Sequence, residues 1–259
     1  MIGNGRGSAS LRPLHRQGES AKERLHKVQH VSSVEPEHAT GSPQLSGLCR
    51  TTIKICDNAS AMHGNPQSFE VLRAYLEARA SFTDDEWQFI RTRFISRRLA
   101  AGDFLQRAGA VAQYSAFVAS GCLRTYTVDA TGKEHIVKFA PETWWVTDLI
   151  SLSTGAPSEY FVEALEDTDL LLVDMKSHET IVDSVPGYAA AYRKGLQKHT
   201  AAKDKRIVSS ISASALGRYL QFLETYPSLV TRIPQWMLAS YLGVTPETVS
   251  RIRRKLARR

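Results

Sequence analysis

The feature that most constrains the fold is the C-terminal stretch of residues 233–259, IPQWMLASYLGVTPETVSRIRRKLARR. A helix over residues 235–242 is predicted by apolar residues at near-helical spacing, namely Trp236, Leu238, Ala239 and Leu242. Gly243 then supplies the left-handed residue with which many helices end. Thr245 and Pro246 favour a second helix, because Thr is a good N-cap and Pro at the first helical position loses no hydrogen bond.

The second helix, predicted over residues 245–257, has one apolar side and one polar side. Val249, Ile252 and Leu256 form its apolar stripe. The residues left to face outward are Glu247, Thr248, Ser250, Arg251, Arg254 and Lys255. The pattern therefore predicts a helix-turn-helix whose second helix is polar and basic.

The charge of the chain is concentrated in the same stretch. The chain carries a formal net charge of +7, and residues 231–259 hold seven basic side chains against the single acid Glu247. The alternative is that the basic C-terminal helix only presents a solvated surface and binds no partner. The turn, the cap and the charge density together favour phosphate as the partner.

The sequence TPETVSR at residues 245–251 resembles the recognition helix of the Crp/Fnr family of bacterial transcription regulators. The resemblance implies that Glu247 and Arg251 contact bases, with Ser250 as a helper, and side-chain chemistry agrees. Thr245, Thr248, Arg254 and Lys255 are expected to contact phosphate. The partners implied are double-stranded DNA with an inverted-repeat site, a second copy of the chain in a homodimer, and RNA polymerase.

Composition sets the limits on the class of protein. The chain has 259 residues, of which 42% are hydrophobic and 23% charged, enough for a substantial core. It contains neither a long apolar run nor the apolar segment of a signal peptide, so we expect a cytoplasmic protein without a membrane partner. The three widely spaced cysteines, Cys49, Cys56 and Cys122, suit a reducing compartment and indicate no metal or iron–sulfur cofactor.

The chain divides into four parts by pattern. Residues 1–66 are rich in Gly, Ser, Pro and mixed charge, and we expect a disordered extension there, with Met62 as a second candidate start of translation. Helical spacing over residues 69–98, with Thr83 as an N-cap, opens a domain predicted over residues 67–185. Short alternating segments around the turn 129–132 predict a β-roll or jelly-roll barrel, so the fold class is α+β.

The resemblance to the family extends from about Phe69 to the end of the chain. FVASGCLRTYTVDATGKEHIVKF at residues 117–139 resembles the strands and hairpin of the family's cyclic nucleotide-binding-type sensor domain. Nucleotide-binding members hold the ligand with a Gly-Glu pair and an Arg-Ser or Arg-Thr pair. Here Thr147-Asp148 takes the place of the first pair, and residues 155–159 contain no arginine. Cyclic AMP is therefore not expected as a ligand, whereas another small-molecule effector stays open.

A long helix is predicted over residues 186–212. Tyr188, Tyr192, Leu196, Ile207 and Ile211 are predicted to share one face, which the resemblance assigns to dimerisation. The alternative is a helix that packs only on its own barrel. The helix-turn-helix domain, residues 213–259, is expected to begin with a helix that turns Leu216, Tyr219, Leu220 and Leu223 inward.

The alternative function is a small-ligand-binding or cupin-like enzymatic barrel with an incidental basic tail. Glu134, His135, His178 and His199 lack the clustered spacing of a cupin metal site, and no hydrolase or phosphate-loop motif occurs. Trp144 and Trp145 either fill the core or stack on a planar ligand. These patterns favour a non-enzymatic regulator.

Overall fold

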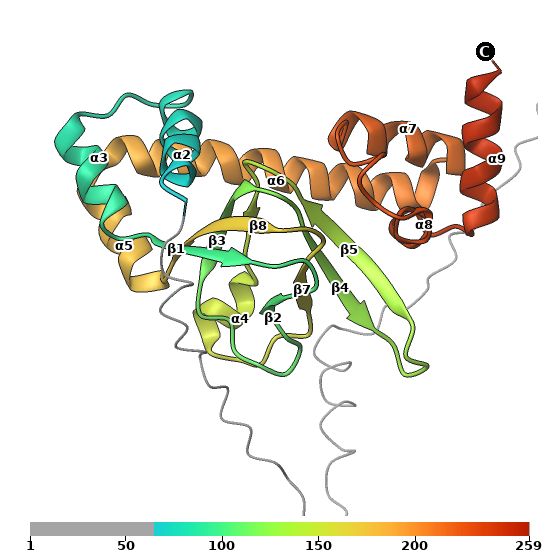
Figure 1. Cartoon of the computed structure of the whole chain (residues 1–259), viewed down its shortest axis with the longest axis horizontal. Helices are drawn as coiled ribbons and strands as arrows, with labels where there is room; N and C mark the ends of the chain where they lie inside the picture. The colour runs from blue at the N-terminus through green and yellow to red at the C-terminus, as the bar shows by residue number, and fades with distance from the viewer. Residues whose placement is uncertain (1–64, 259) are drawn as a thin grey trace, which may run out of the picture. The chain divides into compact units, whose positions relative to one another are not determined.

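The computed structural model describes residues 65–258, apart from the side chain of Lys198, and Figure 1 shows its elements from α2 to α9. The predictions made for residues 1–64 lie outside the described residues. The first elements are α2 (Gln67–Glu77) and α3 (Asp84–Arg91). Thr83 caps α3 as predicted: its Oγ1 accepts from Glu86 N at 3.2 Å, and Glu86 Oε2 accepts from Thr83 N at 2.8 Å.

Two four-stranded antiparallel sheets follow, in the orders β1-β8-β3-β6 and β2-β7-β4-β5. Their strands are β1 (Ile95–Leu99), β2 (Phe104–Gln106), β3 (Ser115–Ser120), β4 (Leu123–Val128), β5 (Glu134–Ala140), β6 (Trp145–Val146), β7 (Phe161–Ala164) and β8 (Thr168–Val173). A short helix, α4 (Leu149–Thr154), lies between β6 and β7. The predicted hairpin is the β4–β5 pair, and Gly132 adopts the positive φ of 82° that its turn requires.

The predicted jelly-roll is confirmed, and its interior is filled by apolar side chains from both sheets. Leu123 and Leu170 are fully buried there. Their buried neighbours in this cluster are Leu99, Ala116, Val118, Ala140, Val146, Val162, Ala164 and Leu172. Burial of these groups on both inner faces drives the two sheets together.

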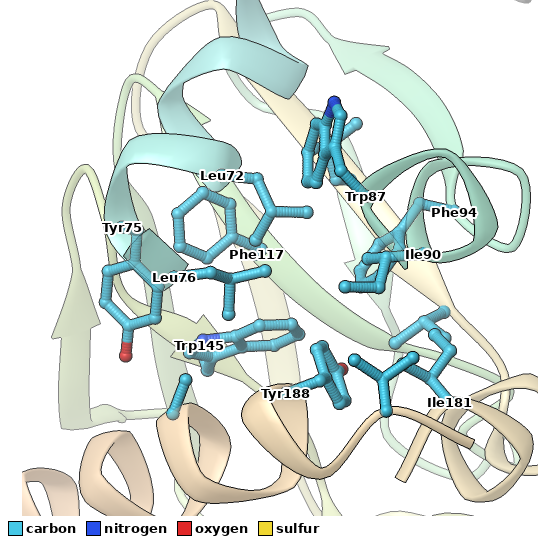
Figure 2. Packing of buried hydrophobic residues seen from close by; sticks show 14 of the residues in the cluster. Leu72, Tyr75, Leu76, Trp87, Ile90, Phe94, Phe117, Trp145, Ile181 and Tyr188 are labelled. Carbon is cyan, nitrogen blue, oxygen red and sulfur yellow. The ribbon is translucent and has the colours of Figure 1, made fainter. Parts of the chain in front are cut away.

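A second cluster joins four helices to the outside of the roll. It packs α2, α3, α5 (Met175–Ser184) and the start of α6 (Pro186–Ser212) against β3 and β8. Figure 2 shows Tyr188 of α6 beside Trp145 and Ile181 in this cluster. Trp145 is 8% exposed, so it belongs to the core rather than to a stacking surface.

The prediction that the apolar stripe of α6 serves dimerisation is wrong for the first half of the helix. Tyr188 is fully buried in the second cluster and Tyr192 packs against it, because this end of the helix lies over α2 and α5. The later members of the stripe remain exposed: Leu196 is 49%, Ile207 49% and Ile211 83% exposed. The helix therefore packs on its own domain at one end and presents apolar side chains at the other.

The last three helices are α7 (Ala215–Thr225), α8 (Gln235–Leu242) and α9 (Pro246–Ala257). Their inner side chains form a third cluster, which also takes in Cys122, Tyr126, Ile136 and Phe139 from the roll. The inward prediction for Leu220 is wrong: Leu220 is 42% exposed, and Phe222 takes the buried position. Trp236, which belongs to the spacing that predicted α8, is 44% exposed, and its neighbour Met237 is buried.

The outer edge of β5 is covered by side chains from α6 and α8. β5 is the last strand of its sheet, and a bulge at Val137 interrupts its pairing with β4. Ser240 Oγ of α8 accepts from Ile136 N at 3.0 Å and donates to Glu134 O at 3.2 Å. Arg206 of α6 donates to Val137 O, to Ile136 O at 3.1 Å and to Tyr241 O at 3.0 Å. These backbone groups of the edge are thereby satisfied.

An ion cluster adds a second link between the roll and the helix-turn-helix. Arg232, in the loop before α8, donates to Glu142 Oε2 at 3.0 Å and Oε1 at 2.8 Å. It also pairs with Glu166. The guanidinium holds the pKa of the Glu142 carboxyl below its usual range against the opposing effect of burial.

We predict that Phe139→Ala lowers the free energy of unfolding by about 3–5 kcal/mol, since Phe139 is fully buried and its ring lies 5.6–6.2 Å from those of Phe222, Tyr226 and Tyr241. Urea unfolding measures this. Val128→Ala, at a position that is 44% exposed on β4, is the control and should change stability by less than about 0.5 kcal/mol. A loss of stability below about 1 kcal/mol for Phe139→Ala would contradict the tight packing of Phe139 against these three rings.

Candidate nucleic-acid interface

The turn between α8 and α9 forms as the sequence predicts. Gly243 ends α8 with a φ of 64°, and Val244 N donates to Ala239 O at 3.0 Å across it. Thr245 caps α9, its Oγ1 accepting from Thr248 N at 3.3 Å, and Pro246 is the first helical residue. These local bonds set the direction in which α9 leaves the turn.

The inner side of α9 is held in the third cluster. Val249 is fully buried and Ile252 is 8% exposed, while Leu256 packs at the margin. Arg253 also faces inward: its Nε donates to Tyr219 OH and its Nη2 to Val230 O, both at 3.3 Å. Arg253 is therefore committed to α7 and the loop that follows it.

The outer side of α9 leaves its charged side chains in solvent. Glu247, Arg251, Arg254 and Lys255 are exposed, and Thr248 and Ser250 are half-buried. The structure thus brings the predicted base-contacting and phosphate-contacting residues onto one short helix and its cap. Arg232 does not join them, because it is engaged by Glu142 and Glu166.

Glu247 and Arg251 lie one turn apart on α9 and are engaged by different groups. Arg251 Nη2 donates to Thr248 Oγ1 at 3.2 Å, one turn back along the helix. Glu247 instead interacts with the start of α9. The Glu247 backbone N–H and the Thr245 side chain lower the pKa of its carboxyl, with a smaller contribution from the Arg251 charge. The N-terminal groups of the helix thus compete with Arg251 for the carboxylate.

A residue that the sequence reasoning missed links the two helices. Gln235, the first residue of α8, donates from Nε2 to Pro246 O at 2.7 Å and to Ser250 Oγ at 2.9 Å. The only sequence clue was a long amide at the start of a helix whose N-cap is Pro234, which has no side-chain cap to offer.

A buried arginine in the roll also escaped the sequence reasoning. Arg124, 7% exposed, pairs with Glu134 at 2.5 Å and with Glu163 at 2.8 Å. Its guanidinium lies 4.3 Å from the centre of the Tyr126 ring and 5.6 Å from that of Trp236. Two carboxylates neutralise this cation, so it is unsuited to anchoring a phosphate.

The segment that corresponds to the family's nucleotide-binding residues is occupied by its own hydrogen bonds. Asp148 caps α4, accepting from Ser151 N at 3.2 Å. Ser158 is 4% exposed; its backbone N donates to Ala110 O at 2.9 Å and its O accepts from Gly109 N at 2.7 Å. Thr147 Oγ1 is buried without a hydrogen-bond partner among the described residues. The sequence 155–159 places no cation here.

Trp144 lies apart from Trp145, at the junction of the roll with α6 and α7. Its ring is 4.7 Å from that of His199 and 5.1 Å from that of Tyr226. It lines an open cavity of about 590 Å³ with Glu142, Lys205 and Glu224. Within residues 65–258, no group of three or more His, Cys, Asp or Glu side chains is placed to hold a metal ion.

Comparison with known proteins agrees with this geometry. Residues 96–184 match the family model of the cyclic nucleotide-binding domain. FixK2 from Bradyrhizobium japonicum superposes with a TM-score of 0.54 at 21% identity, over 63% of this chain and 84% of that one. CLP, the c-di-GMP-responsive global regulator of Xanthomonas campestris, gives a TM-score of 0.55 at 14% identity, over 68% and 92%.

Residues 96–184 thus resemble a cyclic nucleotide-binding domain, and the chain has the fold of the Crp/Fnr regulators. The resemblance stated from residues 117–139 and 245–251 is confirmed at the level of the fold. No curated protein sequence gives a significant match. Among the described residues, no helix is long and apolar enough to cross a membrane.

In this Crp/Fnr fold, the start of α9 depends on its cap. We predict that Thr245→Ala lowers the free energy of unfolding by about 0.5–2 kcal/mol, because Thr248 N loses its side-chain acceptor. Thr245→Ser is the matched control and should retain most of the stability. Urea unfolding measures both, and equal destabilisation of the two variants would show that the hydroxyl does not act as the cap.

Proposed function

We propose that this protein is a DNA-binding transcription regulator of the Crp/Fnr type, which contacts duplex DNA through the outer side of α9. The observation that carries the proposal is the division of α9. Its apolar side is fixed in the third cluster, while Glu247, Arg251, Arg254 and Lys255 stay exposed. A capped helix with a solvated, basic outer side suits the major groove.

Each residue of this outer side has a proposed role. Arg251 donates to the O6 and N7 of guanine, and Glu247 accepts from the amino group of cytosine, with Ser250 beside them. Thr245, Thr248, Arg254 and Lys255 contact phosphate. The low pKa of the Glu247 carboxyl keeps it an acceptor at neutral pH.

A homodimer is proposed through the second half of α6. Leu196, Ile207 and Ile211 lie on one side of the helix and are 49–83% exposed, which is costly for a monomer. A second copy related by twofold symmetry would cover them and place two α9 helices in successive major grooves, about 34 Å apart. The DNA site is then an inverted repeat. RNA polymerase is the further partner that this role implies.

A barrel enzyme or ligand-binding barrel is the weaker proposal. The interior of the roll is filled mainly by apolar side chains such as Leu123, Val162 and Leu170, which favours a packed core over a catalytic pocket there. Whether a small effector binds elsewhere on the molecule is a separate question from the class of protein.

Selection of bound sites from random duplexes tests the proposed function. We expect an inverted repeat to be enriched, bound with a steep salt dependence by a protein of dimeric mass, because each neutralised phosphate releases counterions. Selected sites without dyad symmetry, together with a monomeric mass, would contradict the dimer. Absence of any enrichment would contradict DNA recognition itself.

Substitution separates base contacts from phosphate contacts. Arg251→Ala is expected to cost about 1–3 kcal/mol on the selected site and to change binding to random DNA little. Arg254→Gln and Lys255→Gln should weaken binding to all sequences alike and lower the salt slope by about one each. Salt titrations by fluorescence anisotropy measure these effects. Equal losses for Arg251→Ala on selected and random DNA would refute its role in base recognition.

Cyclic AMP is expected to leave DNA binding unchanged. The cyclic phosphate would meet residues 155–159, which hold no cation, and the neighbouring groups already bond to each other. An effector shifts a two-state equilibrium only by its differential affinity for the two states. Isothermal calorimetry is the measurement, and micromolar binding of cyclic AMP would overturn this expectation.

A further inference from the structure

Gln235 and Ser250 form a polar bridge between α8 and α9 that rests on, and deepens, the proposed function. Gln235 is half-buried, and its Nε2 lies 2.7 Å from Pro246 O and 2.9 Å from Ser250 Oγ. A carbonyl oxygen only accepts, so the amide nitrogen, not the amide oxygen, must face Pro246. The same nitrogen carries a second hydrogen, which it gives to the Ser250 hydroxyl.

The bridge determines which hydrogen bonds the Ser250 hydroxyl can still form. A serine inside a helix commonly donates its hydroxyl hydrogen to the carbonyl four residues earlier, which here is Pro246 O. That carbonyl has two lone pairs, and both are taken: one by the helical N–H of Ser250 and one by Gln235. The Ser250 oxygen meanwhile accepts from Gln235. Its hydrogen is therefore left to donate away from the protein.

The position of Ser250 directs its hydroxyl hydrogen toward the outer side of α9, which is the side proposed to contact DNA. Ser250 follows the buried Val249 and precedes the exposed Arg251, at the border between the inner and outer sides of α9. Gln235 approaches from the inner side, so the outward direction is the one left for the hydroxyl hydrogen.

We propose that Gln235 is a positioning residue for DNA recognition, which holds Ser250 as a hydrogen-bond donor toward the major groove. A donor there favours a base edge that presents an acceptor, such as the N7 and O6 of guanine or the O4 of thymine. It disfavours the cytosine edge, which presents only an amino donor. Gln235 thus influences one base position without contacting it.

Measurement starts from the selected site, with the position facing Ser250 set to each of the four base pairs in turn. Binding by fluorescence anisotropy is compared for Ser250→Ala, Gln235→Met and the double variant; Met keeps a side chain of similar length but removes both donors. We expect each single variant to lose about three- to tenfold affinity for the preferred pair and to bind the four duplexes more evenly. The double variant should lose no more than either single variant, because both remove the same interaction.

Gln221→Ala is the matched control, since Gln221 is a half-buried glutamine on the neighbouring α7. It should leave affinity and base preference unchanged. Urea unfolding of each variant shows whether it is folded at the assay temperature. If Gln235→Met is unfolded, Gln235→Glu replaces it: a carboxylate keeps the shape, loses the bond to Pro246 O and can only accept from Ser250. It too should abolish the preference at the varied pair.

The outcomes distinguish the bridge from the proposed function. Additive losses, or an unchanged base preference in the Gln235 variants while Arg251→Ala still loses specificity, would overturn the bridge alone. Failure of the unmodified protein to prefer any duplex would overturn the proposed function instead.

Discussion

The open edge of β5 is the constraint on which the arrangement of the helix-turn-helix depends. A sheet edge exposes backbone donors and acceptors that need partners, and the bulge at Val137 turns two adjacent carbonyls toward α6. Arg206 binds these carbonyls and the C-terminal end of α8 together, and its guanidinium stacks 4.0 Å from the centre of the Tyr241 ring. One side chain therefore links the long helix, the roll and the first helix of the helix-turn-helix.

This edge and the third cluster fix which side of α9 is free. Ser240 holds α8 on β5, and α8 in turn buries Val249 and Ile252 of α9. The basic side chains of this region fall into two groups as a result. Arg232 and Arg253 are used inside the protein, whereas Arg251, Arg254 and Lys255 face solvent. Positive charge is thus concentrated on the side of α9 that would meet phosphate.

Local chemistry made much of the fold predictable from sequence. The caps at Thr83 and Thr245, the left-handed Gly243 and the β4–β5 hairpin all depend on neighbouring residues, and each formed as predicted. The long helix was predicted with its observed bounds, Pro186–Ser212, because proline starts it and a change of pattern ends it.

Long-range packing accounts for what the sequence did not reveal. Periodicity indicates that a helix has an apolar side but not which surface it meets, so Tyr188 was assigned to a partner and Leu220 to the interior. The pairing of Arg124 with Glu134 and Glu163 joins three strands, and Gln235 reaches Ser250 across a turn. Such contacts depend on the register of distant segments, which residue spacing does not encode.

The central claim is that the helix-turn-helix binds DNA through α9 while it stays docked on the edge of β5. Amide hydrogen exchange of the full chain, followed by mass spectrometry with and without a duplex carrying the selected site, tests this claim most directly. The account predicts slower exchange over residues 245–257 and unchanged exchange over β5 when DNA is bound. Faster exchange over β5, or no change over residues 245–257, would contradict it.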